Sequence, residues 1–416
     1  MTTTTTAKKR FADGPLGDLR VLELTDQKGQ WVGKLMADFG ADVLKIEPPR
    51  GAPERHIGPF YQDIPHLERS LHFWHYNTSK RGITLNLDAA DGQALFKRLA
   101  ARVDVVVETF TPGYLAGLGL GYEDLERANH GIILTSITPF GQTGPYAKYL
   151  GEELVGQASG GLLWMCGWPD RAPVMMGGGP AMHQASAQAA AGTLIALEAR
   201  EQSGEGQQVD VSVQAGLPLT LMASMPEYYA LGVLRQPRVG DFHGSAINGM
   251  FACSDGYADF RFRGRVGQWI NLVEWLASEG MAEDLGEEQW RDNAFRRQPD
   301  NYRHIDDVFQ RFIVRYTRED AMDLAQRKGI EVGAVYTAAE ILSDPQLQAR
   351  QFFVEVEHPE LGKTFVYPGG PYTLTETPWQ LRRRAPLLGE HNLEVFEGEL
   401  GLTRAEVASF SAAGVI

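Results

Sequence analysis

Cysteine is scarce in this chain, and several features that commonly identify a protein class are missing. Only two cysteines occur among 416 residues, Cys166 and Cys253. Two are too few for a disulfide framework or a cysteine-based zinc site, which favours a reducing compartment. We therefore expect a cytoplasmic protein with no metal. The threonine-rich N-terminus has no apolar segment of a signal peptide, so residues 1–13 are predicted to form a disordered tail.

Long apolar runs and excess positive charge are also missing. No run reaches the roughly 18 apolar residues of a membrane span. The formal net charge is −14 and the isoelectric point is about 5.2. These values argue against general nucleic-acid binding and against anchoring on anionic membranes. A local basic pocket in an acidic protein can still hold an anionic ligand, so a nucleotide-like substrate is not excluded.

The usual glycine fingerprint of a dinucleotide-binding fold is missing as well. The apolar runs at 19–26 and 41–49 flank a helical stretch, which predicts a β-α-β unit with parallel strands. The intervening turn, DQKGQ, has no GxGxxG pattern. Further strands are predicted at 83–88 and 104–110 and from residue 131, with a helix between the first two. The first 150 residues are thus predicted to form an open α/β layer sandwich.

The later part of the chain changes character after residue 231. A strand at 207–214 and a helix at 215–231 are predicted to complete the first region. Alternating segments and turns then predict a small antiparallel sheet followed by helices. We expect an α/β fold with a large domain from residues 14–231 and 330–416. A small α+β domain from residues 232–329 is inserted, and a strand beginning at residue 329 returns to the large domain.

Carboxylates are absent from the stretch between Arg171 and Leu197. This stretch contains a glycine-rich loop, residues 175–183, followed by an alanine-rich helix. The amides at the start of such a helix can meet an anionic or carbonyl group. Methionine and tryptophan gather around the loop and predict either a wall for a bulky acyl group or ordinary core packing. These residues are Trp164, Met165, Trp168, Met175, Met176 and Met182.

A series of short motifs identifies a family. In chain order they are GPLGDLRVLELT, LMADFGADVLKIEPPRG, YNTSKRGITLNL, DVVVETFTPGYLAGLGLGYEDL, ITPFGQTGPYA, SGEGQQVDVSVQ, ILSDPQLQARQFF, EHPELGKTFVYPGGP and PLLGEHN. Together they resemble the class III CoA-transferases (the CaiB/BaiF-like enzymes), a family that also includes α-methylacyl-CoA racemases. The resemblance runs in order from about residue 14 to the end of the chain.

The resemblance implies a fold, an assembly and a ligand. Family members have a Rossmann-like large domain from both chain ends, an inserted small domain, and two subunits threaded through each other as an interlocked dimer. The implied ligand is an acyl-CoA, with no cofactor beyond coenzyme A as a substrate. The positions that match CoA-binding residues of the family are Gln27, Lys28, Leu85, Asn86, Thr109, Phe110 and Thr111.

The phosphate-binding positions depart from the family. An arginine often follows the second strand in the family, whereas Pro48 and Pro49 follow it here, with Arg50 or Arg55 as possible substitutes. A second common arginine is replaced near Gly117. For the neighbouring Lys80 and Arg81, a phosphate role and a solvated turn are equally consistent with the sequence. Fewer guanidinium groups would weaken charge-assisted binding of the phosphates.

The nucleophile of the family is also missing. Family transferases use an aspartate at the start of the alanine-rich helix, and that position is Met182 here. The histidine that racemases pair with it aligns with Glu152. Glu153 matches a carboxylate next to the family's active site, and it is either a nucleophile or a positioning group. His183 lies beside the vacant position and is either a general base or a hydrogen-bonded loop residue.

Three functions are consistent with this sequence. The favoured one is a subunit of a class III acyl-CoA:carboxylate CoA-transferase, in which a related partner supplies the aspartate; the alternative assembly is a homodimer. The second is a self-sufficient transferase that uses Glu153. The third is another acyl-CoA enzyme, such as a racemase, isomerase, lyase or hydrolase, or a non-catalytic acyl-CoA binder. A catalytic thiol at either cysteine is a minor alternative to a buried structural role.

Overall fold

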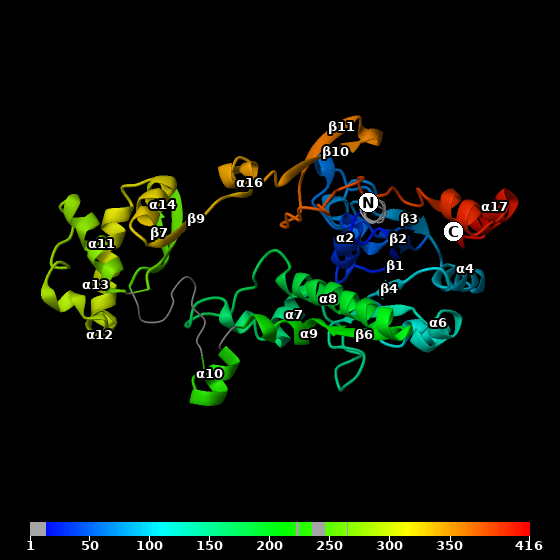
Figure 1. Cartoon of the computed structure of the whole chain (residues 1–416), viewed down its shortest axis with the longest axis horizontal. Coiled ribbons are helices and arrows are strands. Elements are labelled where there is room, and N and C mark those ends of the chain that lie inside the picture. Colours follow the sequence, from blue (N-terminus) through cyan, green and yellow to red (C-terminus); the bar gives the residue numbers. More distant parts are fainter. Residues whose placement is uncertain (1–13, 222–223, 235–245, 264) are drawn as a thin grey trace, which may run out of the picture. The chain divides into compact units, whose positions relative to one another are not determined.

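The computed structural model of the chain describes residues 14–221, 224–234, 246–263 and 265–416. The predicted disordered tail, residues 1–13, lies outside the described residues. The chain divides into two compact units. The larger comprises residues up to 163, 175–234 and 348–416, and the smaller comprises residues 164–174 and 235–347. Figure 1 shows the elements of both units.

A six-stranded parallel sheet forms the centre of the larger unit. Its strands lie in the order β3-β2-β1-β4-β5-β6, and every neighbouring pair is parallel. Most of the strands are short runs rich in valine, isoleucine and leucine that are buried on both faces, as expected for a covered parallel sheet. The predicted open α/β architecture is confirmed. The strands are β1 (Arg20–Leu24), β2 (Asp42–Glu47), β3 (Arg81–Thr84), β4 (Val105–Glu108), β5 (Ile133–Thr138) and β6 (Gln207–Ser212).

Helices cover this sheet. The longest, α8, lies in the connection between β5 and β6 and packs on both strands and on α2 (Figure 1). The α-helices of the larger unit are α2 (Gln30–Asp38), α3 (Leu71–Tyr76), α4 (Ala90–Ala100), α5 (Tyr114–Gly117), α6 (Tyr122–Ala128), α7 (Glu153–Ser159), α8 (Pro180–Ser203), α9 (Val213–Gly216), α10 (Ser224–Leu231) and α17 (Arg404–Ala412). Short 3-10 turns span Pro53–His56, Tyr61–Asp63, Leu163–Met165 and Pro218–Thr220, and a π-helix spans Glu394–Glu399.

Two elements differ from the sequence prediction within this unit. The strand predicted at 83–88 is β3 and ends at Thr84, because the Asn86 side chain accepts a hydrogen bond from the Asp88 amide and turns the chain. The single helix predicted at 215–231 is divided into α9, a 3-10 turn and α10. Pro218 begins the 3-10 turn, since proline cannot donate to a continuing helix. Residues 222–223 of the predicted helix lie outside the described residues.

The smaller unit contains a three-stranded antiparallel sheet with helices. Its strands are β7 (Asn248–Cys253), β8 (Gly256–Arg261) and β9 (Glu331–Ala334), and its helices are α11 (Val266–Ser278), α12 (Asn293–Arg296), α13 (Pro299–Ile313), α14 (Arg318–Arg327) and α15 (Ala338–Ile341), with a 3-10 turn at Glu288–Arg291. The strand predicted to return to the large domain after residue 329 is β9. It pairs with β8 instead, through Phe260 opposite Val332. The compact unit therefore extends to Leu347.

The C-terminal segment closes the larger unit. After α16 (Pro345–Ala349), β10 (Phe353–His358) and β11 (Lys363–Pro368) form an antiparallel ribbon. The last residues then return to the parallel sheet, where the Asn86 amide donates to the Val415 carbonyl at 2.7 Å. Arg81 at the start of β3 binds Glu394 and Glu399 at 2.7 and 2.6 Å. These contacts attach the C-terminus to the edge of the sheet.

Buried charges lie among β1, β2 and α3. We refer to Glu23, Lys45, Glu47, Glu54, Arg55 and Lys80 as the buried charge cluster; each is at most 1% exposed. Lys80 Nζ lies 2.7 Å from Glu23 Oε2, and Arg55 binds both oxygens of Glu47 at 2.7 and 2.8 Å. Gly33 permits this packing, since a Cβ there would lie 1.9 Å from Glu23 Oε2.

None of the described helices combines the length and the apolar content needed to cross a lipid bilayer.

Candidate functional site

The glycine-rich loop ends directly at the N-terminus of α8. Gly178 and Gly179 have φ values of +86° and +71°, which side chains with a Cβ rarely adopt. Pro180 follows as the first residue of α8, where a missing N–H costs nothing. The buried Gln157 side chain holds the preceding loop, because it donates to the Met176 carbonyl at 2.9 Å and accepts from the Met176 amide at 3.0 Å. Met182 and His183 therefore lie in the first turn of α8, and not in the loop as the sequence suggested.

The side chain of Glu153, which lies at the start of α7, caps the N-terminus of α8. Its Oε1 accepts from the Ala181 amide at 2.9 Å and from Gln157 Nε2 at 2.7 Å. Its Oε2 accepts from the Met182 amide at 3.0 Å. A carboxylate at a helix N-terminus satisfies unpaired amides and interacts favourably with the helix dipole. This arrangement matches the positioning role that the sequence left open for Glu153, since three donors already occupy its oxygens.

A cavity of about 280 Å³ adjoins the N-terminus of α8, and we call it the α8 cavity. Met182 is 7% exposed and its thioether lines this cavity. A thioether has no proton to lose and no charge with which to attack a carbonyl carbon. The residues that line the cavity are Gln27, Trp31, His72, Tyr76, Glu153, Gly178, Gly179, Met182, His183 and Ser186.

His183 is held by two aromatic side chains. Its Nε2 lies 2.7 Å from the Tyr76 hydroxyl, and the ring of Trp31 meets it edge to face with ring centroids 4.8 Å apart. Trp31 comes from α2 and Tyr76 from α3, so three helices converge on this imidazole. The sequence prediction included His183 but missed Trp31, His72 and Tyr76. The dense run of histidine and aromatic residues at 72–76 is the signal that could have pointed to them.

The histidines of α3 are held in the neutral form. Burial lowers the pKa of His72 below its ordinary value, and the nearby His183 lowers it further. Burial lowers the pKa of His75 to about 4, with Lys34 contributing. Near pH 7 both rings are thus uncharged and can act as one donor and one acceptor each.

A second cavity, of about 320 Å³, lies at the carboxyl ends of the strands, and we call it the strand-end cavity. Four of the predicted CoA-binding residues line it: Leu85, Asn86, Thr109 and Phe110. In open parallel sheets ligands bind in crevices at this end of the strands. Thr111 instead lines a neighbouring cavity of about 400 Å³, and Gln27 lines the α8 cavity. The predicted CoA-binding residues that line a cavity are therefore divided among three cavities of the larger unit.

Several of these residues also have structural partners. Thr109 Oγ1 accepts from the Asp26 amide at 2.9 Å, and Asn86 Oδ1 accepts from the Asp88 amide at 3.0 Å. Lys28 pairs with Asp26. Lys28 is the only cation among the predicted CoA-binding residues, and Asp26 already neutralises it. None of these residues therefore offers a free positive charge to a phosphate.

The wall of the strand-end cavity is acidic. Asp26, Glu47, Glu54 and Asp88 line it, and neither lysine nor arginine does. Glu54 is 1% exposed, and its Oε2 accepts no hydrogen bond from any described residue. Burial raises the pKa of this carboxyl. The cavity therefore favours groups that donate hydrogen bonds, such as hydroxyl and amino groups, over phosphates.

The basic residues that the sequence offered for phosphate binding are engaged elsewhere. Arg55 is completely buried against Glu47 and Glu68. Lys80 is completely buried against Glu23, and Arg81 binds Asp42, so neither lies in a solvated turn. The solvated-turn alternative for Lys80 and Arg81 is wrong, because both side chains are buried in ion pairs with carboxylates of β1 and β2. Arg50 alone of this group is exposed.

Three other predicted candidates lie outside this arrangement. Glu152 is exposed at the N-cap of α7 and does not line the α8 cavity. Burial raises the pKa of both thiols, Cys166 and Cys253, which keeps them protonated and weakly nucleophilic.

The methionine and tryptophan side chains of the predicted acyl wall belong to both compact units. Met175, Met176 and Met182 are in the larger unit, and Trp164, Met165 and Trp168 are in the smaller one.

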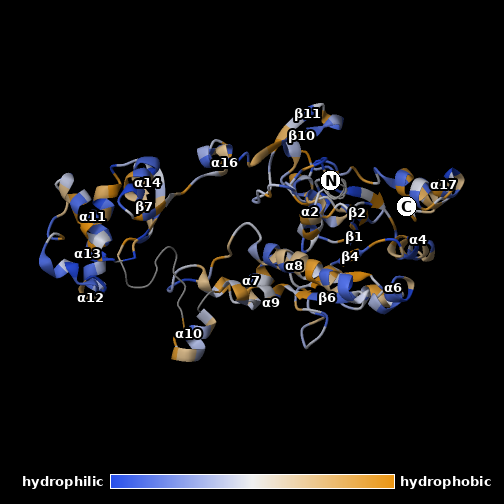
Figure 2. Cartoon of the chain, viewed as in Figure 1, coloured by the Kyte–Doolittle hydropathy of each residue, from blue (hydrophilic) through white to orange (hydrophobic). Residues whose placement is uncertain are grey.

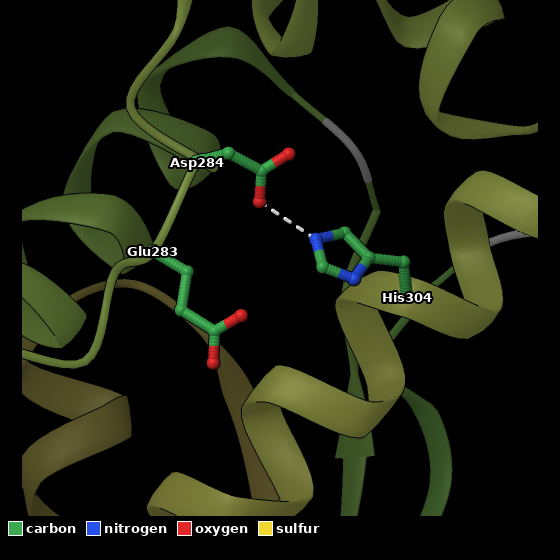
Figure 3. A group of neighbouring side chains, drawn as sticks. All are labelled: Glu283, Asp284 and His304. Carbon is green, nitrogen blue, oxygen red and sulfur yellow. Dashed lines mark hydrogen bonds and ion pairs between the residues drawn. The ribbon is translucent and has the colours of Figure 1, made fainter.

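One group of side chains in the smaller unit has the composition of a metal site. Glu283, Asp284 and His304 offer ligand atoms within 4.8 Å of one another (Figure 3). Asp284 Oδ1 lies 2.7 Å from His304 Nε2, and Arg311 binds Glu283 at 2.6 Å. The ion pair with Arg311 and the exposure of Glu283 fit a surface ion-pair group as well as a ligand set.

Comparisons with known proteins identify relatives along almost the whole chain. The model of CoA-transferase family III matches residues 16–392. The chain is 35% identical over 401 residues to BbsE of Thauera aromatica, a subunit of succinyl-CoA:(R)-benzylsuccinate CoA-transferase, covering 95% of this chain and 97% of that protein. It is 36% identical over 405 residues to succinyl-CoA–D-citramalate CoA-transferase of Chloroflexus aurantiacus, covering 97% and 98%. A crystal structure of a CaiB/BaiF family protein from Brucella suis superimposes with a TM-score of 0.83 and 29% identity, covering 95% of this chain and 100% of that one.

Proposed function

Because this chain belongs to CoA-transferase family III, we propose that it is one subunit of an acyl-CoA:carboxylate CoA-transferase and that a related partner subunit supplies the catalytic aspartate. The observation that carries this proposal is the first turn of α8. Met182, which the resemblance assigns to the nucleophile position, lines the α8 cavity with a thioether, and the oxygens of the neighbouring Glu153 accept hydrogen bonds from the helix amides. This subunit then contributes acyl-CoA binding and the wall of the α8 cavity.

The chemistry assigned to the partner is the covalent route of the family. The aspartate carboxylate attacks the thioester carbonyl carbon, the CoA thiolate leaves, and a mixed anhydride forms. The thiolate then attacks the aspartyl carbonyl, which releases the first acid and leaves CoA bound to the aspartate as a thioester. The second acid takes over the CoA by the reverse sequence, so no oxidant or cofactor is needed.

The alternative in which Glu153 is the nucleophile is opposed by its contacts. Attack would require Glu153 to leave the amides of Ala181 and Met182 and the side chain of Gln157. Hydrogen bonds to a charged group contribute about 1.5–3 kcal/mol each, so freeing the carboxylate would cost several such contributions. The same donors stabilise the anion and reduce its nucleophilicity.

Exposed apolar side chains support a dimeric assembly of the interlocked kind, with either an identical or a related partner. Leu150 is 88% exposed, Ile195 on α8 is 69% exposed and Tyr229 on α10 is 93% exposed. Figure 2 shows hydrophobic residues along α8 and α10. Exposed apolar surface of this kind commonly marks an interface. The relative from Thauera aromatica, named as a subunit, supports the heteromeric form over the homodimer.

The substrates proposed for this assembly are an acyl-CoA and a carboxylic acid. The strand-end cavity is the proposed site of the CoA nucleoside, with Leu85, Asn86, Thr109 and Phe110 in its wall and Lys28 and Thr111 nearby. Gln27 and His183 line the α8 cavity, where the thioester would lie. The acidic wall suits ribose hydroxyls and the adenine amino group, which donate hydrogen bonds.

Restoring the aspartate tests this proposal directly. The purified chain would be mixed with succinyl-CoA and isotopically labelled free acids, and label entering the thioester pool would be followed by mass spectrometry. We expect no exchange by the unmodified chain and measurable exchange by Met182→Asp. The control Met182→Asn, whose side chain has the shape of aspartate without its charge, should remain inactive. Exchange by the unmodified chain alone would contradict the need for a partner.

The partner itself gives a second test. Co-expression with a related subunit that retains the aspartate is expected to yield a stable complex with exchange activity. The same complex carrying Asp→Asn in the partner should be inactive. A partner that forms the complex but needs no aspartate would contradict the proposed division of labour.

A further inference from the structure

A chain of hydrogen bonds leads from the buried charge cluster to the α8 cavity. Lys80 Nζ binds both oxygens of Glu23, at 2.9 and 2.7 Å, and donates to Asn77 Oδ1 at 2.9 Å. The Asn77 amide orientation is thereby fixed, and its Nδ2 donates to the Phe73 carbonyl at 3.0 Å. Lys80 and Asn77 are fully buried, so water does not compete with these bonds.

The same chain continues through Gln30 to His72. Asn77 Nδ2 donates to Gln30 Oε1 at 3.4 Å, so the Gln30 nitrogen is the atom that faces His72. Gln30 Nε2 lies 2.6 Å from His72 Nε2. Since the amide nitrogen can only donate, His72 Nε2 accepts. A neutral imidazole with Nε2 as acceptor carries its proton on Nδ1.

We infer that His72 is a ligand-binding residue of the α8 cavity, which presents its Nδ1–H to an oxygen atom of the bound acyl group or acid. His72 lines the cavity and is half-buried, and no described residue accepts a hydrogen bond from its Nδ1. This inference rests on the proposed function, because the oxygen atom belongs to the acyl-CoA or acid substrate. Gln30 and Asn77 are positioning residues, since they act through His72.

The chemistry of the cavity selects the ligand atom. The other side chains of its wall are aromatic or uncharged apart from Glu153, whose oxygens are occupied by helix amides. An uncharged donor among such groups binds a carbonyl or carboxylate oxygen without a counter-charge. His72 thus gives the site a fixed recognition point that does not depend on the missing aspartate.

The tautomer of His72 can be measured without any activity. Long-range ¹H–¹⁵N correlation spectra of the full chain with labelled histidine would be recorded at pH 7, with His72 assigned by its loss in His72→Phe. We expect a neutral ring with the proton on Nδ1. In Gln30→Leu, which removes the amide donor, we expect the Nε2–H form to appear. A wild-type ring with the proton on Nε2, or on both nitrogens, would overturn the inference.

Binding measurements separate this inference from the proposed function. Dissociation constants of succinyl-CoA and free CoA would be measured by calorimetry for the wild type and for His72→Phe, which keeps a ring but lacks the donor. Loss of one hydrogen bond predicts binding of succinyl-CoA about tenfold weaker in the variant and unchanged binding of free CoA. Equal binding of succinyl-CoA by both proteins would overturn the role of His72 alone. A wild type that binds neither compound would overturn the proposed function, and this inference with it.

Should His72→Phe fail to fold, Gln30→Leu replaces it in the same measurement. A rotated donor predicts weaker binding of succinyl-CoA with free CoA unaffected, and an unchanged affinity would contradict the inference.

Discussion

Two groups of carboxylates in the larger unit are held in different ways. On β1 and β2, Glu23 lies against Lys80 and Glu47 against Arg55, each pair fully buried. Glu108 at the end of β4 and Glu153 at the start of α7 have no cation within ion-pair distance among the described residues. Glu108 accepts from the Phe110 amide and from Ser136, and Glu153 accepts from three amide groups.

This difference separates carboxylates that hold the fold in place, which we call the framework, from carboxylates that can take part in chemistry. A buried ion pair keeps both groups charged and fixed, and breaking it is costly. A carboxylate held only by neutral donors can change its protonation state or its contacts at lower cost. The basic motif of residues 80–81 therefore belongs to the framework. Glu153 lines the α8 cavity, and Glu108 lines the neighbouring cavity that also contains Thr111.

Breaking an ion pair of the framework should have the largest effect. Arg55→Met leaves Glu47 buried without its partner, so we expect a loss of about 3–5 kcal/mol in the free energy of unfolding. Denaturant titration followed by circular dichroism measures it. Arg50→Met is the matched control, because Arg50 is exposed in the same segment and should change stability by less than about 0.5 kcal/mol. Equal stability of the two variants would show that the pair carries no framework role.

Glu108 should make the stability of the protein fall as the pH rises. Burial raises the pKa of Glu108 from 4.5 to about 7. Between these values the folded state binds more protons than the unfolded state, so stability falls as the pH rises from about 4.5 to 7 and the penalty persists above it. The contribution is about 3 kcal/mol. Glu108→Gln should remove it, as seen in denaturant titrations at pH 5 and pH 8, whereas the exposed Glu123→Gln should keep the wild-type slope.

Glu153→Gln should have a smaller effect on stability but a local one. The amide can accept only through its single oxygen, so one of the two amides of Ala181 and Met182 loses its partner. Loss of a helix cap costs about 1–2 kcal/mol. Hydrogen exchange should speed up at the start of α8, and any acyl-CoA exchange activity of the complex should fall strongly. The neighbouring Glu152→Gln, whose side chain makes no capping hydrogen bond, should leave both readouts unchanged.

Local patterns predicted the elements well, and contacts between distant segments account for the failures. The apolar run around Glu23 identified β1, yet nothing near it revealed that the carboxylate pairs with Lys80, 57 residues later. Residues 331–334 looked like a strand of the large sheet because apolar alternation does not name a pairing partner. The register with β8 is a tertiary property.

The candidate site was predictable only along one segment. Met182 and Glu153 were singled out from motifs that are continuous in sequence. His72 and Tyr76 were missed because they reach the cavity from α3, with Tyr76 107 residues before the histidine that it contacts. The sequence also extended the glycine-rich loop to residue 183, whereas Pro180 and the capping by Glu153 begin α8 earlier.

The position of α7, the glycine loop and α8 within a single β5–β6 connection has an evolutionary consequence. Met182 takes part in neither the ion pair of Glu47 with Arg55 nor the C-terminal attachment at β3, which lies at the opposite edge of the sheet from β6. Under the proposed division of labour, a duplicated gene copy could therefore lose an aspartate at this position and keep the ion pairs of its fold. Such a copy would be kept for as long as the related copy retained the catalytic aspartate, since only the two together would form an active enzyme.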